Sequence, residues 1–427
     1  RHRGPDDAGV YSSPDGSCLL AHRRLSIVDL SADGHQPMCD ESGALWLVFN
    51  GEIYNYIELR EELVSLNHSF QTRTDTEVLL AAFQEWGRAC QDKLNGMWAF
   101  VIYDTLTKEI FASRDRYGIK PLYYSINNDQ LIFASEIPAV LEVQTSKPKP
   151  DYQSIFDYLV FNRTDQTERT FFSGIQKLQH GHNFSLDRNK HFKIEKWYDL
   201  RRKIENPFNN SIEYKQTLSS SIGLRLRSDV PVGTCLSGGL DSSSIVSIIL
   251  NDYKKKDLNT FSAIYGKGKK GDESSFINEF EPYLKNMFYT YPSAETLFSD
   301  INKFIQTQAE PIPSTNPYAQ YKVMELAKEH VVVTLDGQGA DEALAGYHYF
   351  YGFYFKDLLI QFRWLRLLSE ISFYLKNHSS LYGIKTFLYF LLPEHFRTSL
   401  RINEKGYLKK DFTNYYFNSN SIAGNLY

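Results

Sequence analysis

The segment at residues 232–250, VGTCLSGGLDSSSIVSIIL, constrains the fold of this chain more than any other stretch. An apolar run stops at two glycines, one aspartate follows among serines, and a second apolar run begins. This pattern predicts a buried strand, a glycine turn and a helix. Glycines let backbone N–H groups approach an anion, and the start of a helix adds unpaired N–H groups and a positive dipole end. We therefore expect a parallel sheet with helices, and an anion site outside the carboxyl end of this strand.

Asp241 adds a second requirement to the expected site. A carboxylate repels a phosphate unless a hard cation such as Mg²⁺ lies between them. The loop is not a Walker A motif, because no Gly-Lys-Ser/Thr sequence closes it. It is not a nucleophile elbow either, because Cys235 stands where the GxSxG pattern needs a glycine. A plain glycine turn between strand and helix is the alternative.

Two stretches of the second half resemble known ATP sites. SGGLDSS resembles the pyrophosphate loop of the N-type ATP pyrophosphatases, and VVVTLDGQGADEALAGY is similar to the second ATP-side loop of the glutamine-dependent asparagine synthetases. The resemblance implies ATP and Mg²⁺, with Asp241 and Asp341 as catalytic carboxylates that bind the metal. It also implies ATP contacts from Leu236, Ser237, Gly238, Gly239, Leu240, Asp241, Ser242, Ala263, Asp336 and Gly337.

Gln338 is a further catalytic candidate in the second of these stretches. Some members of the family carry a glutamate at this position. A glutamine can donate and accept hydrogen bonds but cannot act as a base. We therefore expect the two aspartates to carry most of the chemistry.

The sequence of the first half indicates mainly strands, and not the alternation of strands and helices expected in the second half. Up to about residue 199, short segments are rich in aromatic and β-branched residues: GALWLVFN, GMWAFVIYD, EIFASR, KPLYYS and QLIFAS. Two other segments have helical spacing, NYIELREELVSL and TDTEVLLAAFQEWG. The second is expected to begin with Thr74 or Asp75 as its N-cap and to end near Gly87. An α+β domain with helices packed outside strand-rich layers is predicted.

Five motifs of this half occur in the order of a class II glutamine amidotransferase domain: RHRGPDD, AHRRLSIVDL, NGEIYNY, RTDTEVLL and RDRYGIKPLYY. The resemblance covers nearly all of residues 1–200. It implies an N-terminal-nucleophile-type fold of stacked antiparallel sheets flanked by helices. It also implies glutamine contacts from Arg24, Val28, Asn50, Gly51, Glu52 and Asp75.

The chemistry of these side chains suits glutamine, which has a carboxylate, an ammonium and an amide. Arg24 can clamp the carboxylate with two parallel hydrogen bonds, and Glu52 and Asp75 can hold the ammonium. Asn50 and the N–H of Gly51 are expected at a tight turn after a strand. There they can donate to the oxyanion that forms when the amide is attacked, which makes both catalytic candidates. A simple hairpin turn is the alternative interpretation of Asn-Gly.

The amidotransferase nucleophile is the one element without a matching residue. In that family it is an amino-terminal cysteine whose own amino group acts as the base. This chain begins at Arg1, and Cys18, Cys39 and Cys90 stand in other contexts, where we expect inert small core residues. The resemblance therefore predicts truncation at both ends, with the catalytic cysteine missing. The chain as given is predicted not to hydrolyse glutamine.

Two domains are predicted, separated by the polar segment RRKIENPFNN at residues 201–210. Residues 1–200 form the amidotransferase domain. Residues 211–427 form the ATP pyrophosphatase domain, with a helical and very aromatic carboxyl-terminal part. The net charge of −4 argues against a nucleic-acid partner, and four cysteines without a CxxC pair favour a reducing compartment. The densest apolar patch is too short for a membrane span, so we expect a cytoplasmic protein, with a homodimer as a further possibility.

Both resemblances together imply a glutamine-hydrolysing asparagine synthase. Such an enzyme amidates aspartate to asparagine with ammonia from glutamine, through β-aspartyl-AMP, and releases AMP and pyrophosphate. Two alternatives stay open. One is a related amide-forming ligase for another carboxylate, β-lactam synthetase-like or peptide-modifying. The other is a non-catalytic homologue.

Overall fold

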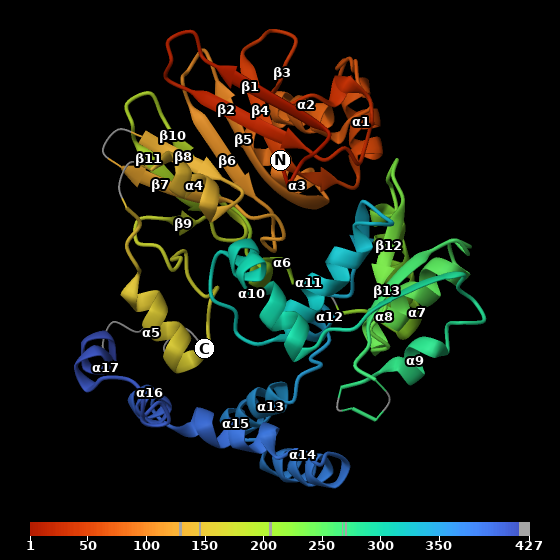
Figure 1. Ribbon diagram of the computed structural model, residues 1–427, viewed down its shortest axis with the longest axis vertical. Coiled ribbons are helices and arrows are strands. Elements are labelled where there is room, and N and C mark those ends of the chain that lie inside the picture. Colours follow the sequence, from red (N-terminus) through yellow and green to blue (C-terminus); the bar gives the residue numbers. More distant parts are fainter. Residues whose placement is uncertain (128–129, 145–146, 205–206, 267, 270, 418–427) are drawn as a thin grey trace. The chain divides into compact units, whose positions relative to one another are not determined.

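The computed structural model describes residues 1–127, 130–144, 147–204, 207–266, 268–269 and 271–417 (Figure 1). The chain divides into two compact units. The larger unit comprises Arg1–Pro148, Thr167–Ala309 and Thr315–Asp336. The smaller unit comprises Lys149–Gln166, Glu310–Ser314 and Gly337–Tyr427.

A central antiparallel sheet organises the first part of the larger unit. Its described strands follow the order β11-β10-β6-β5-β4-β3. Their bounds are β3 Met38–Cys39, β4 Leu45–Ile53, β5 Gly96–Asp104, β6 Ile110–Arg114, β10 His182–Leu186 and β11 Phe192–Lys196. β4 and β5 pair along their whole length, from Leu45 opposite Asp104 to Ile53 opposite Gly96. This long ladder is the most extensive pairing in the described sheet.

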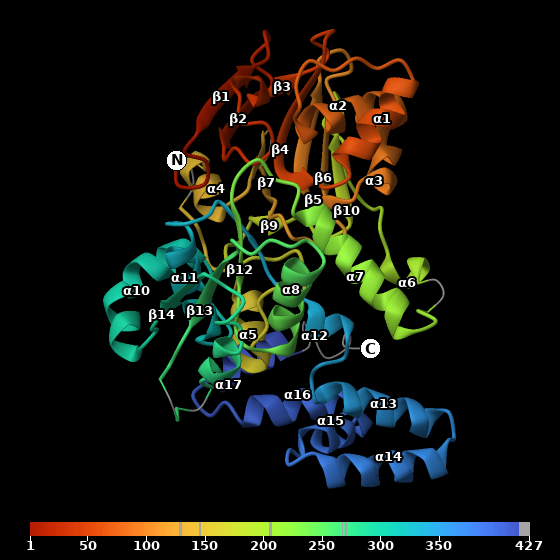
Figure 2. The same ribbon diagram turned by 90° about the vertical axis from the view of Figure 1, so that its right-hand side faces the viewer.

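The two faces of this sheet carry different layers, because successive side chains of a strand point to opposite faces. On one face, Leu47 and Phe100 pack with helices α1 and α2 in one apolar cluster. On the other face, Val48 and Val101 pack with residues of the smaller sheets. Figure 2 shows α1 and α2 on one side of β4 and the strands β1 and β2 on the other. The predicted stacked antiparallel sheets with flanking helices are thus confirmed.

The remaining elements of this part have these bounds: β1 Asp7–Ser12, β2 Leu19–Arg24, η1 Ala32–Gly34, α1 Tyr56–Ser65, α2 Asp75–Trp86, η2 Gly87–Ala89, α3 Cys90–Lys93, β7 Tyr123–Asn127, β8 Gln130–Ala134, α4 Ile137–Val143, β9 Gln176–Lys177 and α6 Leu200–Lys203. β1 pairs with β2, and β8, β7 and β9 form a third sheet. Helix α2 starts as its sequence predicts. The Oγ1 of Thr74 accepts the N–H of Glu77 at 3.1 Å, and Gly87 ends the helix with a φ of 55°.

A parallel sheet forms the second part of the larger unit, with the described order β14-β13-β12-β15. Its strands are β12 Val232–Cys235, β13 Asn259–Ala263, β14 Asn286–Thr290 and β15 Val333–Leu335, and its helices are α7 Ser211–Arg225, α8 Leu240–Asn251, α9 Ser274–Asn278, α10 Ala294–Gln308 and α11 Asn316–Ala327. The three predicted strands of this sheet are confirmed, whereas β14 was not predicted. From β12 the chain adds β13 and β14 on one side of the sheet, and then β15 on the other side of β12. Ligands of open α/β sheets bind outside the carboxyl ends of strands at such a switch point.

Helices build the smaller unit: α5 Tyr152–Phe161, α12 Ala340–Ala343, α13 Tyr349–Ile360, α14 Trp364–Asn377, α15 Tyr382–Leu391, α16 Glu394–Asn403 and α17 Lys410–Phe417. Phe355, Tyr374 and Phe387 are central to an apolar cluster formed by α13, α14 and α15. Phe156 of α5 packs against Phe412 of α17, with ring centroids 6.1 Å apart. The unit therefore joins a segment from the first predicted domain to the end of the second. In the described part of the chain, every helix is too short or too polar to cross a membrane.

Candidate active site

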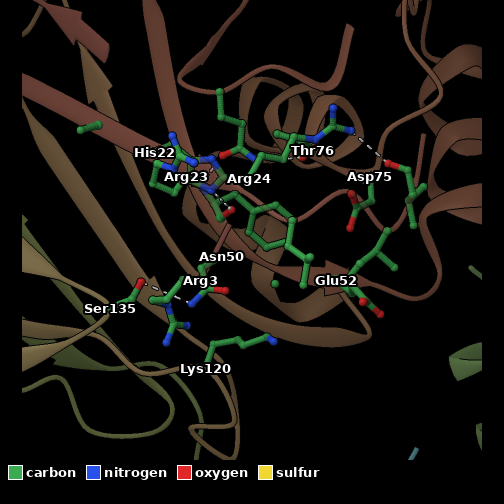
Figure 3. A pocket seen from close by; sticks show the side chains of 17 residues that line it. Arg3, His22, Arg23, Arg24, Asn50, Glu52, Asp75, Thr76, Lys120 and Ser135 are labelled. Carbon is green, nitrogen blue, oxygen red and sulfur yellow. Dashed lines mark hydrogen bonds between the residues drawn. The ribbon is translucent and has the colours of Figure 1, made fainter. Parts of the chain in front are cut away.

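A cavity of about 270 Å³ lies between the strand layers and α2 in the larger unit (Figure 3). All six predicted glutamine-binding residues line it: Arg24, Val28, Asn50, Gly51, Glu52 and Asp75. They come from the end of β2, the loop after it, the carboxyl half of β4 and the first turn of α2. Residues far apart in the sequence thus share one polar pocket, which we call the amide pocket.

The guanidinium of Arg24 is fixed inside the amide pocket by backbone carbonyl groups. It donates to Ser31 O at 2.7 Å, to Val28 O at 3.3 Å and to Asp29 O. A Cβ atom on Gly34 would overlap this guanidinium, so a glycine is required beside it. Carbonyl oxygens orient the group without neutralising its charge. Arg24 is therefore ready to bind an anionic group of a ligand.

Two buried carboxyl groups, Glu52 and Asp75, lie on another side of the amide pocket. Burial, with the neighbouring charge of Asp75, raises the pKa of Glu52 to about 7, and Lys120 opposes this shift. Burial also raises the pKa of Asp75 to about 6, although the N–H of Ile53 donates to its Oδ2 at 2.9 Å. Among the described residues, Oε1 of Glu52 has no hydrogen-bond partner. A ligand cation between these groups would supply the missing partner and favour their charged forms.

Asn50 and Gly51 lie within strand β4 and not at a tight turn. They are opposite Ala99 and Trp98 of β5, so the expected turn is wrong. The strand continues to Ile53 because β5 supplies a partner for each residue up to that point. Nδ2 of Asn50 donates to Oγ of Ser135 at 3.4 Å, as Figure 3 shows. A Cβ atom on Gly51 would overlap Met97 O, which explains why this strand position needs a glycine.

Sequence reasoning missed several lining residues, above all Lys120 and His22. Lys120 belongs to a loop built around the buried carboxylate of Asp115, which accepts the N–H groups of Trp98, Tyr117, Ile119 and Lys120 at 3.0–3.2 Å. Burial lowers the pKa of Lys120, and the charge of Glu52 opposes that shift. Burial lowers the pKa of His22 to about 4, so this side chain is neutral near pH 7. The motif RDRYGIKPLYY contains Lys120, but nothing in its spacing showed that the side chain enters the pocket.

The cysteines lie elsewhere in the structure. Cys18 and Cys90 are buried, and burial raises the pKa of their thiols to about 11 and about 12. Cys39 is exposed on β3, so the expectation that it is a core residue is wrong. The short strand β3 forms the edge of the sheet, which leaves this side chain uncovered. No cysteine is among the described residues that line the amide pocket.

The loop after β12 has the geometry of an anion site in the parallel sheet. Leu236 is buried and Ser237 is exposed. Gly238 has a φ of 83°, and a Cβ atom there would lie 2.9 Å from Glu273 O. Helix α8 follows without a side-chain cap, so its first N–H groups remain available. The loop is therefore open to a ligand and not part of the core.

Serine hydroxyl groups occupy part of this loop. The N–H of Ser237 donates to Oγ of Ser242 at 3.2 Å, and the N–H of Gly239 donates to Oγ of Ser237 at 3.3 Å. Asp336, directly after β15, accepts the N–H of Cys235 at 3.2 Å. The carboxyl edge of the sheet thus brings together the predicted ATP contacts Leu236, Ser237, Gly238, Gly239, Leu240, Asp241, Ser242, Ala263 and Asp336.

Gly337, Gln338 and Asp341 belong to the smaller unit. Asp341 lies on the short helix α12, and Gly339 precedes this helix with a φ of 96°. A Cβ atom on Gly346 would overlap the Asp341 carboxylate. The joint role of Asp241 and Asp341 at one metal ion stays a prediction.

The donor set of the loop fits Mg²⁺ bound together with a nucleotide. Among the described residues, no group of three or more histidine, cysteine, aspartate or glutamate side chains is placed to hold a metal. Magnesium bound to a nucleotide commonly uses one or two protein carboxylates and the phosphate oxygens of the substrate. Asp241, in the first turn of α8, can supply such a carboxylate.

Comparison with known proteins gives the family. Residues 1–198 match the family described as glutamine amidotransferase domain, and residues 213–414 match the family described as asparagine synthase. A protein of Methanocaldococcus jannaschii with the provisional name asparagine synthetase [glutamine-hydrolyzing] 2 is 35% identical over 95% of this chain and 81% of its own length. The first half is therefore a glutamine amidotransferase domain. The chain belongs to the asparagine synthetase family.

Other relatives are longer than this chain. Asparagine synthetase [glutamine-hydrolyzing] 1 of Bacillus subtilis is 35% identical over 81% of this chain and 54% of its own length. Amidase chry2 of Gibberella zeae is 30% identical over 82% of this chain and 54% of its own length. The chain thus spans about half the length of these two relatives.

Proposed function

We propose that this chain takes part in ATP-dependent amidation of aspartate to asparagine, with ammonia from glutamine. The observation that carries the proposal is the meeting of Arg24, Asn50, Glu52 and Asp75 in one pocket. A fixed cation, two buried acids and an amide donor match the three polar groups of glutamine. The family membership supports the same reaction class.

In the amide pocket, we assign each group of glutamine to a partner. The guanidinium of Arg24 binds the carboxylate, and Glu52 with Asp75 holds the ammonium. Asn50 and the N–H of Gly51 donate to the oxygen of the side-chain amide as it gains negative charge. Because no cysteine is among the described lining residues, we propose that this chain binds glutamine without hydrolysing it.

At the parallel sheet, the loop at residues 237–242 holds the phosphate groups of ATP through backbone N–H groups and the start of α8. The serine hydroxyls that now engage two of these N–H groups would rotate toward the phosphate oxygens. Asp241 would hold Mg²⁺, with Asp341 as its proposed second carboxylate. Bound MgATP supplies the adenylyl group that makes the acceptor carboxyl electrophilic, through β-aspartyl-AMP.

A second candidate is amide formation on another carboxylate. Its support is the similarity to amidase chry2, at 30% identity. This alternative uses the same amide pocket and the same phosphate loop, so it differs from the first proposal in the acceptor alone. A non-catalytic homologue would need neither set of residues.

One assay separates these possibilities. Pyrophosphate release from MgATP is measured with ammonium chloride as nitrogen donor and with aspartate, glutamate or a β-amino acid as acceptor. Release that depends on aspartate supports the first proposal, whereas release with another acid alone supports the second. No release with any acid, together with no binding of ATP by calorimetry, would contradict both.

A further inference from the structure

The segment Arg225–Asp229, which we call the linking segment, belongs to the second part of the larger unit and forms hydrogen bonds with the first part. It starts at the last residue of α7, and only Val230 and Pro231 separate it from β12. β12 leads directly into the phosphate loop. Any shift of this segment is therefore transmitted to the strand that carries the loop.

The linking segment contacts the loop after β2, which is one lip of the amide pocket. The N–H of Asp29 donates to Oδ2 of Asp229 at 2.8 Å. In return, the N–H of Asp229 donates to Ile27 O at 3.0 Å. Ile27 and Val28 both line the pocket. Two hydrogen bonds thus attach this lip to a residue 200 positions later in the chain.

Asp29 is the residue through which this attachment reaches Arg24. It has a φ of 57°, in the left-handed region that aspartate adopts more readily than most residues. Its carboxylate accepts the N–H groups of Ser31 at 3.0 Å and of Arg73 at 2.9 Å. Its carbonyl oxygen is one of the three acceptors of the Arg24 guanidinium. The position of Arg24 therefore depends on the loop that Asp229 holds.

The linking segment also contacts the residues that directly follow β4, at Tyr54 and in the first turn of α1. Arg227 donates to both carboxylate oxygens of Glu58, at 2.6 and 2.5 Å, and to Tyr54 O at 2.8 Å. The guanidinium of Arg225 lies 4.7 Å from the centre of the Tyr54 ring. Tyr54 follows Glu52 by two residues. Arg225, Arg227 and Asp229 thus hold both the loop after β2, which lines the amide pocket, and the residues just beyond the pocket residue Glu52.

We propose that the linking segment couples glutamine binding to nucleotide binding, with Asp229 and Arg227 as positioning residues. This inference rests on the proposed function, because it needs glutamine in the amide pocket and ATP at the loop. Each ligand shifts a lip or a strand that the other ligand also requires. Linkage then demands that each ligand changes the affinity for the other by the same factor.

The test measures the dissociation constant of glutamine by calorimetry, with and without Mg²⁺ and α,β-methylene-ATP. The ratio of the two constants is the coupling factor. We expect a factor of about 5 or more for the unchanged chain, within the usual range of allosteric coupling. Asp229→Ala and Arg227→Ala should bring it close to 1. Asp229→Asn, which keeps a side-chain oxygen that can accept the N–H of Asp29, should retain most of it.

The matched control is Asp187→Ala. Asp187 is a half-buried aspartate that likewise accepts backbone N–H groups, those of Asn189 and His191, and it lies in a hairpin outside the amide pocket. A residue with a purely structural role would lower the unfolding midpoint and weaken both ligands without changing their ratio. The control should leave the coupling factor at the value of the unchanged chain.

Each other outcome contradicts the inference. An equal coupling factor in the unchanged chain, Asp229→Ala and Arg227→Ala would overturn it while leaving the proposed function intact, because both ligands still bind. No binding of glutamine or nucleotide by the unchanged chain would overturn both. If Asp229→Ala does not fold, hydrogen exchange of the unchanged chain decides the matter: nucleotide should slow exchange of the Asp29 amide several-fold, and an unchanged rate refutes the coupling.

Discussion

Individual residues of the amide pocket are held in states that are unfavourable without a ligand. Glu52 and Asp75 are buried carboxyl groups with raised pKa values, and among the described residues the Arg24 guanidinium donates to neutral carbonyl groups. Burying charge without a matching partner costs stability. Side chains in such electrostatic states are common at binding sites, because a bound ligand supplies the charges and hydrogen bonds that they lack.

Glu52→Gln tests this at the residue scale. The pKa of Glu52 is about 7 in the folded chain against an ordinary value of 4.5, so the folded state binds the proton more tightly. Its contribution to stability is present below about pH 4.5 and is lost as the pH rises toward 7. We expect the substitution to raise the free energy of unfolding at pH 8 by about 2–3 kcal/mol, to change little at pH 4, and to abolish glutamine binding. Unfolding in urea at both pH values measures the effect.

Glu61→Gln serves as the control for that experiment, because Glu61 is exposed on α1. It should change neither the stability nor the affinity. Equal stability of Glu52→Gln and the unchanged chain at pH 8 would show that the Glu52 carboxyl is not destabilised there.

The same titration predicts that glutamine affinity falls below about pH 7, since protonated Glu52 no longer attracts an ammonium.

At the scale of elements, the sequence predicted most strands and helices, because burial and alternation mark them directly. The strands around 45–53 and 96–104 and the helix at 75–86 are confirmed. Asn50 and Gly51 were misplaced because a partner strand, which local sequence does not show, can keep an Asn-Gly pair extended. β14 was not predicted, although Phe288, Tyr289 and Thr290 are residue types that favour a strand. Lys120 was missed because the position of its backbone depends on a hydrogen bond from its N–H to the carboxylate of Asp115. The spacing of the motif does not show this bond.

Six residues of the amide pocket could be predicted, because each stands in a motif with recognisable spacing, whereas Lys120 and His22 were missed. The linking segment could not be predicted, since its contacts with Asp29, Tyr54 and Glu58 join residues about 170–200 positions apart. Only folding brings such residues together.

The turn between β12 and α8 gives the prediction at this scale. Gly238 has a φ of 83°, and a Cβ atom there would lie 2.9 Å from Glu273 O. Gly238→Ala should therefore destabilise the loop by about 1–2 kcal/mol and weaken binding of MgATP at least tenfold. Calorimetry with MgATP measures the affinity, and thermal unfolding measures the stability.

Gly271→Ala is a matched control for that substitution. Gly271 has nearly the same φ, 85°, but a Cβ atom there meets nothing within 4 Å. It should show the backbone cost alone and keep the affinity for MgATP. If both alanine variants bind MgATP equally well, close approach of the backbone at residue 238 is not what the nucleotide requires.

At the scale of the whole molecule, the two units have separate apolar cores, so they can differ in stability. Tyr374 is fully buried in the smaller unit, and its hydroxyl accepts the N–H of Gly383 at 3.0 Å. Tyr374→Phe leaves this buried N–H without that partner, at a cost of about 1–3 kcal/mol. We expect a lower unfolding midpoint for α13–α15, followed by limited proteolysis, and unchanged glutamine binding in the larger unit. The exposed Tyr382→Phe is the control, and loss of glutamine binding by Tyr374→Phe would contradict the independence of the two cores.

The chain enters the smaller unit three times, at Lys149–Gln166, Glu310–Ser314 and Gly337–Tyr427. During synthesis, α5 therefore leaves the ribosome long before the helices that cover it, which are translated after residue 337. At a typical elongation rate, this delay is on the order of 10 to 40 s. Throughout that time Phe156 of α5 lacks the rings of Phe412 and Tyr416, against which it packs in the finished fold, and chaperones can bind it. Expression temperature and chaperone supply should thus decide the yield of this protein more than the stability of its finished fold.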